Sequence, residues 1–81
     1  MKFSGSVVTE QGQTFGIIRV KSHVLNNSSE REDIIEFGRR AFGNMPIILF
    51  DDKRFYGRPD IVSFLTRIHP SRIPWKEYTI D

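Results

Sequence analysis

The sequence predicts an α+β fold: a single small domain with the element order ββαββαβ, in which a mixed sheet of four to five strands packs against two helices. Three observations predict it. A consecutive apolar run stands at 46–50, two segments at 29–42 and 59–68 carry apolar residues at helical spacing, and β-prone segments stand at both ends of the chain. A chain of 81 residues has room for one domain.

The apolar run at 46–50 is the predicted central strand. Its residues Ile47 to Phe50 are all apolar, and because strand side chains alternate in direction, both faces of the strand must be covered. Pro46 suits the first position of a strand. If both helices pack on one face, the other apolar face stays exposed and marks an interface. Helices on opposite faces would cover both, and the sequence leaves these two arrangements equally open.

Two predicted hairpins flank the first helix. Phe3 to Thr9 alternates loosely, and a polar break containing Gly12 separates it from a β-rich run at Phe15 to Leu25. In that run one set of alternating residues is expected to face the core: Ile18, Val20, Ser22 and Val24. The second hairpin joins the central strand to Phe55-Tyr56 through a polar turn at 51–53. A last strand is predicted from Trp75 to Ile80.

Both helices have clear ends in the sequence. Ser29 and Glu32 form a predicted capping box, and Gly43 is expected to end the first helix as a left-handed residue. Gly38 within it allows a close approach to the sheet. The second helix is predicted to begin at Pro59, a favourable first position, and to end near Ile68 or His69, before Pro70.

Composition excludes several classes of function. The chain has no cysteine, so disulfides, thiolate metal sites and thiol redox chemistry are excluded. No apolar run approaches the ~18 residues of a membrane span, and the N-terminal residues lack the apolar core of a signal peptide, so we expect a cytoplasmic protein without membrane contact. The net charge of +2 is small and evenly spread, which argues against a domain built to bind polyanions.

One set of residues nevertheless has the composition of a single-stranded nucleic-acid site. In such sites bases stack on aromatic rings while cations follow the phosphates. The alternative is that the rings belong to the core and the cations form a solvated rim. The candidate binding patch consists of Arg54, Tyr56, Arg58, Arg72, Trp75 and Lys76.

Catalytic patterns are weak. Asp51 and Asp52 stand where adjacent acids usually form a turn, and His23 and His69 show no metal-ligand spacing. The serines lack a nucleophile-elbow context, and the glycines form no phosphate loop. We therefore predict no catalytic residue, no metal ligand and no cofactor.

The sequence favours a non-catalytic protein-interaction module that binds a protein partner, or a second copy of itself as a homodimer, through an exposed sheet face or an edge strand. The first alternative is single-stranded nucleic-acid binding by the patch above. The second is a small-molecule enzyme, which would need a polar pocket holding His23 or His69 with a carboxylate.

Overall fold

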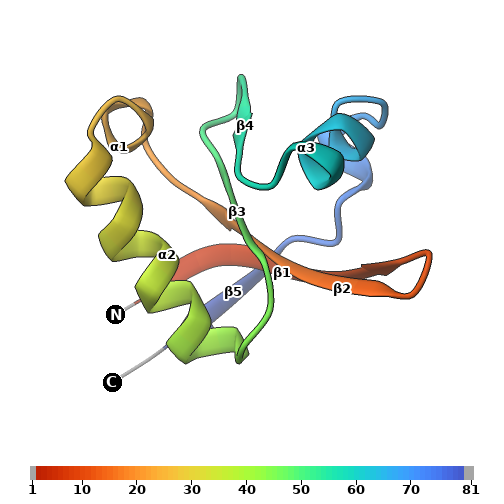
Figure 1. Cartoon of the computed structure of the whole chain (residues 1–81), viewed down its shortest axis with the longest axis horizontal. Coiled ribbons are helices and arrows are strands. Elements are labelled where there is room, and N and C mark those ends of the chain that lie inside the picture. The colour runs from red at the N-terminus through yellow and green to blue at the C-terminus, as the bar shows by residue number, and fades with distance from the viewer. Residues whose placement is uncertain (1, 80–81) are drawn as a thin grey trace.

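The structure is a computed structural model that describes residues 2–79, and it is a small α+β domain built on one five-stranded sheet (Figure 1). The order of strands across the sheet is β4-β3-β2-β1-β5. Along the chain the elements are β1 (Lys2–Glu10), β2 (Gln13–Arg19), α1 (Ser22–Leu25), α2 (Ser28–Phe42), β3 (Ile47–Phe50), β4 (Phe55–Tyr56), α3 (Pro59–Leu65), the 3-10 helix η1 (Pro70–Arg72) and β5 (Lys76–Thr79).

The sheet is mixed, as predicted. β2 and β3 run parallel and are joined through α2, whereas the pairs β1–β2, β1–β5 and β3–β4 are antiparallel. The turn between β1 and β2 places Gln11 and Gly12 at φ of 51° and 78°. Positive φ at both central residues is the geometry that matches the twist of a two-residue hairpin.

The helices α2 and α3 lie on opposite faces of the sheet (Figure 1), so of the two arrangements that the sequence left open, the structure has the one in which both faces are covered. Ile48 and Phe50 of β3 pack with Ile61 and Leu65 of α3 in one core cluster. Ile47 and Leu49 point the other way and pack with the residues of α2 in a second cluster. The predicted central strand is therefore covered on both faces, and no apolar sheet face is left at β3 for a partner.

The predicted second strand is wrong in its C-terminal half. β2 ends at Arg19, and Ser22–Leu25 is the short helix α1, an additional helix that the predicted order lacked. Val20 still donates its N–H to the Phe50 carbonyl at 2.8 Å, but the chain then turns, and Leu25 is buried at the end of α1. The expected single core face is also wrong, because Ile17 and Ile18 are both buried, one in each cluster. Tertiary packing on both faces overrides the alternation pattern.

Several element boundaries also differ from those predicted. The N-cap of α2 is Asn27, whose Oδ1 accepts the N–H of Glu30 at 3.0 Å, so the expected cap at Ser29 lies inside the helix. Gly43 ends α2 as predicted, with φ of 103°. α3 stops at Leu65, before the predicted end. β5 begins at Lys76, so Trp75 precedes the strand, and Ile80 lies outside the described residues.

Gly38 makes the close approach that its position in the sequence suggested. A Cβ atom at this position would lie 2.8 Å from Ile18 Cδ1 and 3.0 Å from Ile47 Cγ2. The absence of a side chain therefore lets α2 pack directly on β2 and β3. Among residues 2–79, no helix combines the length and the apolar character needed to cross a membrane.

Candidate functional site

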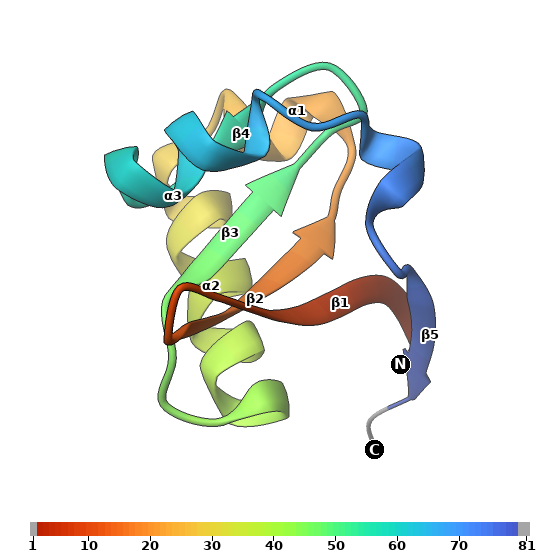
Figure 2. The same cartoon turned by 90° about the vertical axis from the view of Figure 1, so that its right-hand side faces the viewer.

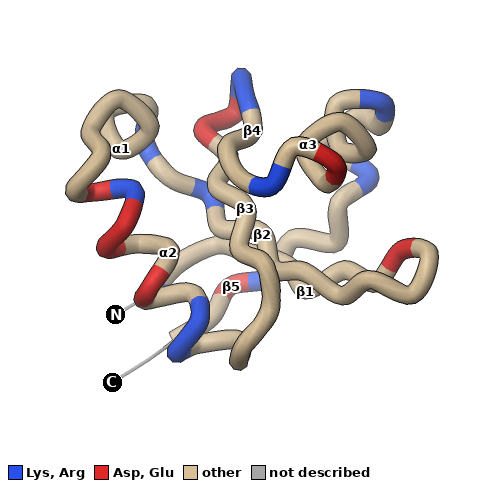
Figure 3. The backbone as a smooth tube through the Cα atoms, in the orientation of Figure 1, with Lys and Arg blue, Asp and Glu red and all other residues tan. Residues whose placement is uncertain are grey.

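The six residues of the predicted patch fall into two groups. Tyr56 lies in β4, with Arg54 and Arg58 in the flanking loops, whereas Lys76 lies in β5 and Trp75 directly precedes it. β4 and β5 are the two opposite edges of the sheet. The remaining member, Arg72, ends η1. The Lys and Arg positions are likewise distributed over separate elements (Figure 3).

Both rings of this set already contact cations of the same chain. The Arg31 guanidinium lies 4.6 Å from the centre of the Tyr56 ring. Trp75 stacks on Phe50 with 5.8 Å between ring centres, and the Arg19 guanidinium lies 5.3 Å from the Trp75 ring. These are cation–π and stacking distances. Each ring is therefore already engaged by side chains of this chain, and the two do not form an open row of stacking platforms.

Two of the cations are paired as well. Arg58 contacts the Asp60 carboxylate through its Nε at 2.9 Å and its Nη2 at 2.7 Å. This pair raises the pKa of Arg58 and lowers that of Asp60 to about 2, chiefly through the direct hydrogen bond. Arg54 donates from Nη2 to the side-chain oxygen of Asn26 at 2.7 Å.

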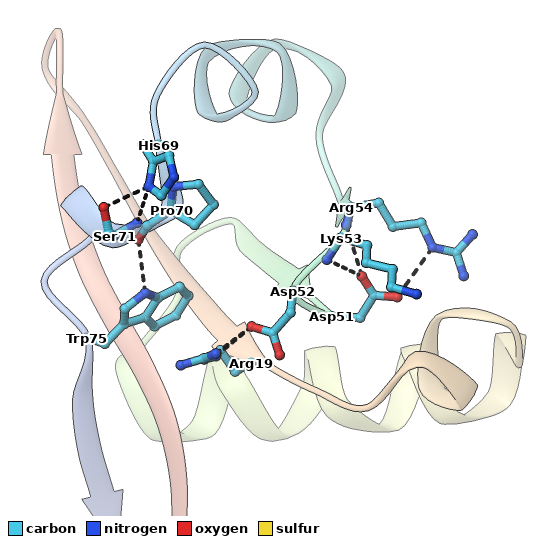
Figure 4. Close-up of polar contacts among 9 residues, drawn as sticks. All are labelled: Arg19, Asp51, Asp52, Lys53, Arg54, His69, Pro70, Ser71 and Trp75. Atoms are coloured by element: carbon cyan, nitrogen blue, oxygen red, sulfur yellow. Dashed lines mark hydrogen bonds and ion pairs between the residues drawn. The ribbon is translucent and has the colours of Figure 1, made fainter.

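The adjacent aspartates form the turn after β3, as the sequence indicated (Figure 4). Asp51 Oδ1 accepts the amides of Lys53 at 3.0 Å and Arg54 at 2.9 Å. Burial alone raises the pKa of Asp51, but these two amides and the Arg54 guanidinium outweigh it, and the pKa is lowered overall. Asp52, at φ of 76°, accepts Arg19 Nε at 3.0 Å. Within residues 2–79, no group of three or more acidic or histidine side chains is placed to hold a metal ion.

The two histidines make different local contacts. His69 caps η1: its Nδ1 accepts the backbone N–H of Ser71 at 3.2 Å and lies 2.7 Å from Ser71 Oγ (Figure 4). A side chain that accepts the amide two residues later is a local capping contact. His23 is an exposed residue of α1, with Nε2 at 3.5 Å from Glu30 Oε2. Neither contact resembles the base and orienting group of a nucleophilic site.

The feature that stands out instead is an edge of β1. β1 is nine residues long, but β5 pairs only with Lys2 to Gly5 (Figure 2). Beyond Gly5 the chain leading into β5 leaves the sheet, because Trp75 precedes the strand and packs on Phe50. The outer side of β1 from Ser6 to Glu10 therefore has no neighbouring strand among the residues described.

The direction of each backbone group along β1 follows from the ladder of β2. Gly16 donates its N–H to the carbonyl of Pro46, and Val20 donates its N–H to the carbonyl of Phe50. The backbone N–H and C=O groups of the even-numbered residues of β2 therefore point toward β3. The backbone groups of successive residues in a strand point to opposite edges, so those of the odd-numbered residues of β2 point toward β1. Their partners across the hairpin have even numbers, as in the pair of Ser6 with Ile17. The backbone groups of the even-numbered residues of β1 therefore form hydrogen bonds with β2, and those of its odd-numbered residues point away from β2.

Two residues thus have outward backbone groups beyond the end of β5: Val7 and Thr9. No further backbone partner exists for either residue within the described part of the chain. Val7 is 42% exposed, and Thr9 is exposed. We call the outward N–H and C=O groups of these two residues the open edge.

A pocket adjoins the open edge on the α3 side of the sheet. Its volume is about 260 Å³. Val8 lines it from β1, and Phe64, Leu65 and Ile68 line it from α3 and the residues that follow. Ile73 and Pro74, which lead into β5, also line it, and two exposed charged residues complete the lining: Glu10 and Arg72.

Sequence reasoning missed the open edge, although it predicted both strands involved. The predicted lengths gave no signal, because the strands expected at 3–9 and 75–80 are nearly equal, whereas the observed strands are nine and four residues long. Which neighbour each strand takes is decided by nonlocal pairing. No protein-family model, no curated protein and no solved structure matches this chain.

Proposed function

We propose that this protein is an interaction module that binds an extended segment of a partner protein as an additional strand on the open edge of β1. The single observation that carries this proposal is that the outward backbone groups of Val7 and Thr9 have no partner among residues 2–79. An added strand would satisfy the donor and the acceptor of both residues. Strand addition to an exposed sheet edge is a recurring mode of peptide recognition.

The residues of the open edge support this proposal because they lack the features that usually protect an exposed edge strand. Proteins usually protect an exposed edge strand with lysine, proline, a bulge or a covering loop. Here Val7-Val8-Thr9 is uncharged and has high β-propensity, and a charge appears only at Glu10. The two outermost strands are different, since β4 is only two residues long and β5 carries the charged residues Lys76 and Glu77. The open edge of β1 is therefore the best template for strand pairing that the fold offers.

A flexible segment of another protein fits this edge better than a second copy of the chain. If two copies paired antiparallel about Val8, Glu10 of one copy would face Ser6 of the other. Gln11 would then face Gly5, and that place is already taken by Lys76. The hairpin turn of one copy would collide with β5 of the other, whereas an extended peptide can leave the edge at that point.

Thr9→Pro tests the proposal directly. Proline removes the outward N–H of Thr9, which the ladder with β2 does not use, and proline is tolerated where a strand N–H faces solvent. We expect the unfolding free energy to change by less than about 1 kcal/mol. Affinity for peptides selected from a displayed random library should fall about tenfold, the effect of one lost hydrogen bond. Thr9→Val, which keeps the N–H and loses only the hydroxyl contact with Thr14, is the matched control.

The readout is amide hydrogen exchange followed by NMR in the intact chain. Bound peptide should slow exchange at Val7 and Thr9 and leave the residues of β4 unchanged. Equal binding by the Thr9→Pro protein, or protection at other elements only, would contradict the proposal. Binding of a poly-dT oligonucleotide with shifts centred on Tyr56 and Trp75 would instead favour the nucleic-acid alternative.

A further inference from the structure

We infer that the partner segment carries an apolar side chain that enters the pocket beside Val8 and, two residues toward the β5 end of the added strand, an acidic side chain that pairs with Arg72. This inference rests on the proposed strand addition and adds the chemistry of the partner. It follows from which side of the sheet the pocket occupies and from the signs of the two charges that line it.

The alternation of a strand decides which partner residue meets the pocket. Val8 packs against the core cluster on the α3 side of the sheet, and the pocket lies on that side. A residue placed opposite Val8 on an added strand points to the same side as Val8. That residue therefore projects toward Phe64, Ile68 and Ile73, and these apolar neighbours favour a branched aliphatic or aromatic side chain.

The charges at the two ends of the pocket differ in sign. Glu10 is the last residue of β1, at the hairpin end of the open edge. Arg72 belongs to η1, which leads through Ile73 and Pro74 into β5 at the other end. An acidic side chain is therefore attracted at the β5 end and repelled at the hairpin end. On the added strand, the residue that lies two positions from the apolar one and faces Ser6 is the one nearest Arg72.

Arg72 is also free to accept such a partner. Of the other arginines that line surface pockets, Arg19, Arg54 and Arg58 bond to carboxylates of the chain, whereas Arg39 makes no side-chain hydrogen bond or ion pair to residues 2–79. Arg72 makes no side-chain hydrogen bond or ion pair to any residue from 2 to 79, and it is exposed. A guanidinium can bind a carboxylate through two parallel hydrogen bonds, which gives geometric specificity as well as affinity. The cation thus lies beside an apolar pocket and has no side-chain partner among residues 2–79.

A charge-swap experiment tests the inference. The probe is a peptide selected from the random library, with variants in which the apolar residue is changed to serine or the acidic residue to lysine. We expect each peptide change to lower the affinity of the wild-type protein about tenfold. Arg72→Glu should lower the affinity for the parent peptide about tenfold and restore binding of the lysine variant. Arg67→Glu, a change at an exposed arginine that does not line the pocket, is the matched control.

The outcomes separate this inference from the proposal beneath it. If peptides protect the amides of Val7 and Thr9 but show no preference for an apolar or acidic residue, the pocket chemistry is wrong and strand addition stands. If Arg72→Glu weakens binding and the lysine peptide does not restore it, the pairing with Arg72 is wrong. If no peptide protects these amides, both ideas fail. Thermal unfolding of each variant, expected to match that of the wild type, confirms that the fold is intact.

Discussion

β3 and the outer half of β1 belong to the same sheet but differ in how completely they are enclosed. β3 has a strand on each edge and a core cluster on each face, and its four residues are at most 5% exposed. The stretch from Ser6 to Glu10 has β2 on one edge and no strand from the described residues on the other, and Val7 is 42% exposed. β3 is therefore covered at both edges and on both faces, whereas the outer half of β1 has backbone hydrogen-bonding groups without a partner among residues 2–79.

This difference separates the residues that hold the fold from those available for binding. Burying apolar side chains on both faces makes β3 the element on which folding depends most. Open backbone groups add nothing to the stability of the isolated chain, but they can add to the stability of a complex. Substitutions in the two regions should therefore affect unfolding and binding in opposite proportions.

The largest effect on stability is expected at the enclosed strand. Ile48 is 0% exposed, and Ile48→Ala removes buried methyl and methylene groups and leaves a cavity between β3 and α3. We expect a loss of about 2–5 kcal/mol of unfolding free energy, measured by urea denaturation. Ile48→Val, which removes a single methylene, should cost about 0.5–1.5 kcal/mol. A loss below that of the valine variant would contradict the assignment of β3 as the central element.

An intermediate effect is expected at the turn that leaves β3. The Asp51 carboxylate accepts two backbone amides, and Asp51→Asn removes its charge, so we expect a cost of about 1–2 kcal/mol at neutral pH. The pKa of Asp51 is lowered from 3.8 in the folded protein, so this stabilisation is complete above 3.8 and is lost as the pH falls through the lower folded value. The difference between wild type and Asp51→Asn should therefore shrink in acid.

A second carboxylate, that of Asp60, also changes its charge in the acid range of this experiment. Asp60, whose pKa is lowered to about 2 by Arg58, loses its pairing in an overlapping range of pH. Both proteins are therefore compared in an Asp60→Asn background, with unfolding followed at several pH values. A difference that stays constant from neutral pH into acid would show that the Asp51 charge does not stabilise the turn.

The smallest effect on stability is expected at the open edge. Val7→Thr preserves the β-branched shape at an exposed position, so the unfolding free energy should change by less than about 0.5 kcal/mol. Thermal unfolding checks this value. A loss comparable to that of Ile48→Val would mean that Val7 is covered in solution, for example by a second copy, and the protein would then show a concentration-dependent melting temperature.

Much of the fold could be predicted from local sequence patterns. The apolar run at 46–50, the turn at Asp51 and the spacing of apolar residues in α2 each reflect interactions within a few residues, so their type is visible in the sequence. The predicted strand over residues 20–25 failed because α1 forms where the chain leaves the sheet, and Leu25 is buried by packing on a distant element. β-propensity describes a preference that tertiary contacts override.

The candidate site was less predictable than the fold. The basic and aromatic residues looked like a patch in sequence, but Trp75 stacks on Phe50, and β4 and β5 lie at opposite edges of the sheet. The open edge depends on the lengths of two strands that are far apart in the chain, and its pocket combines β1, α3 and the segment before β5. Arg72 was part of the predicted patch, but its neighbours in the fold give it a different proposed role.

By itself the sequence determined the class of fold, the enclosed strand at residues 47–50 and the absence of cysteine chemistry, because apolar spacing and residue chemistry act locally. Only the tertiary structure decided that the helices take opposite faces and that no described residue pairs with the outward backbone groups of Val7 and Thr9. The physical reason is that strand neighbours are selected by pairing and packing over the whole chain, so an edge exists only once every strand has found its place.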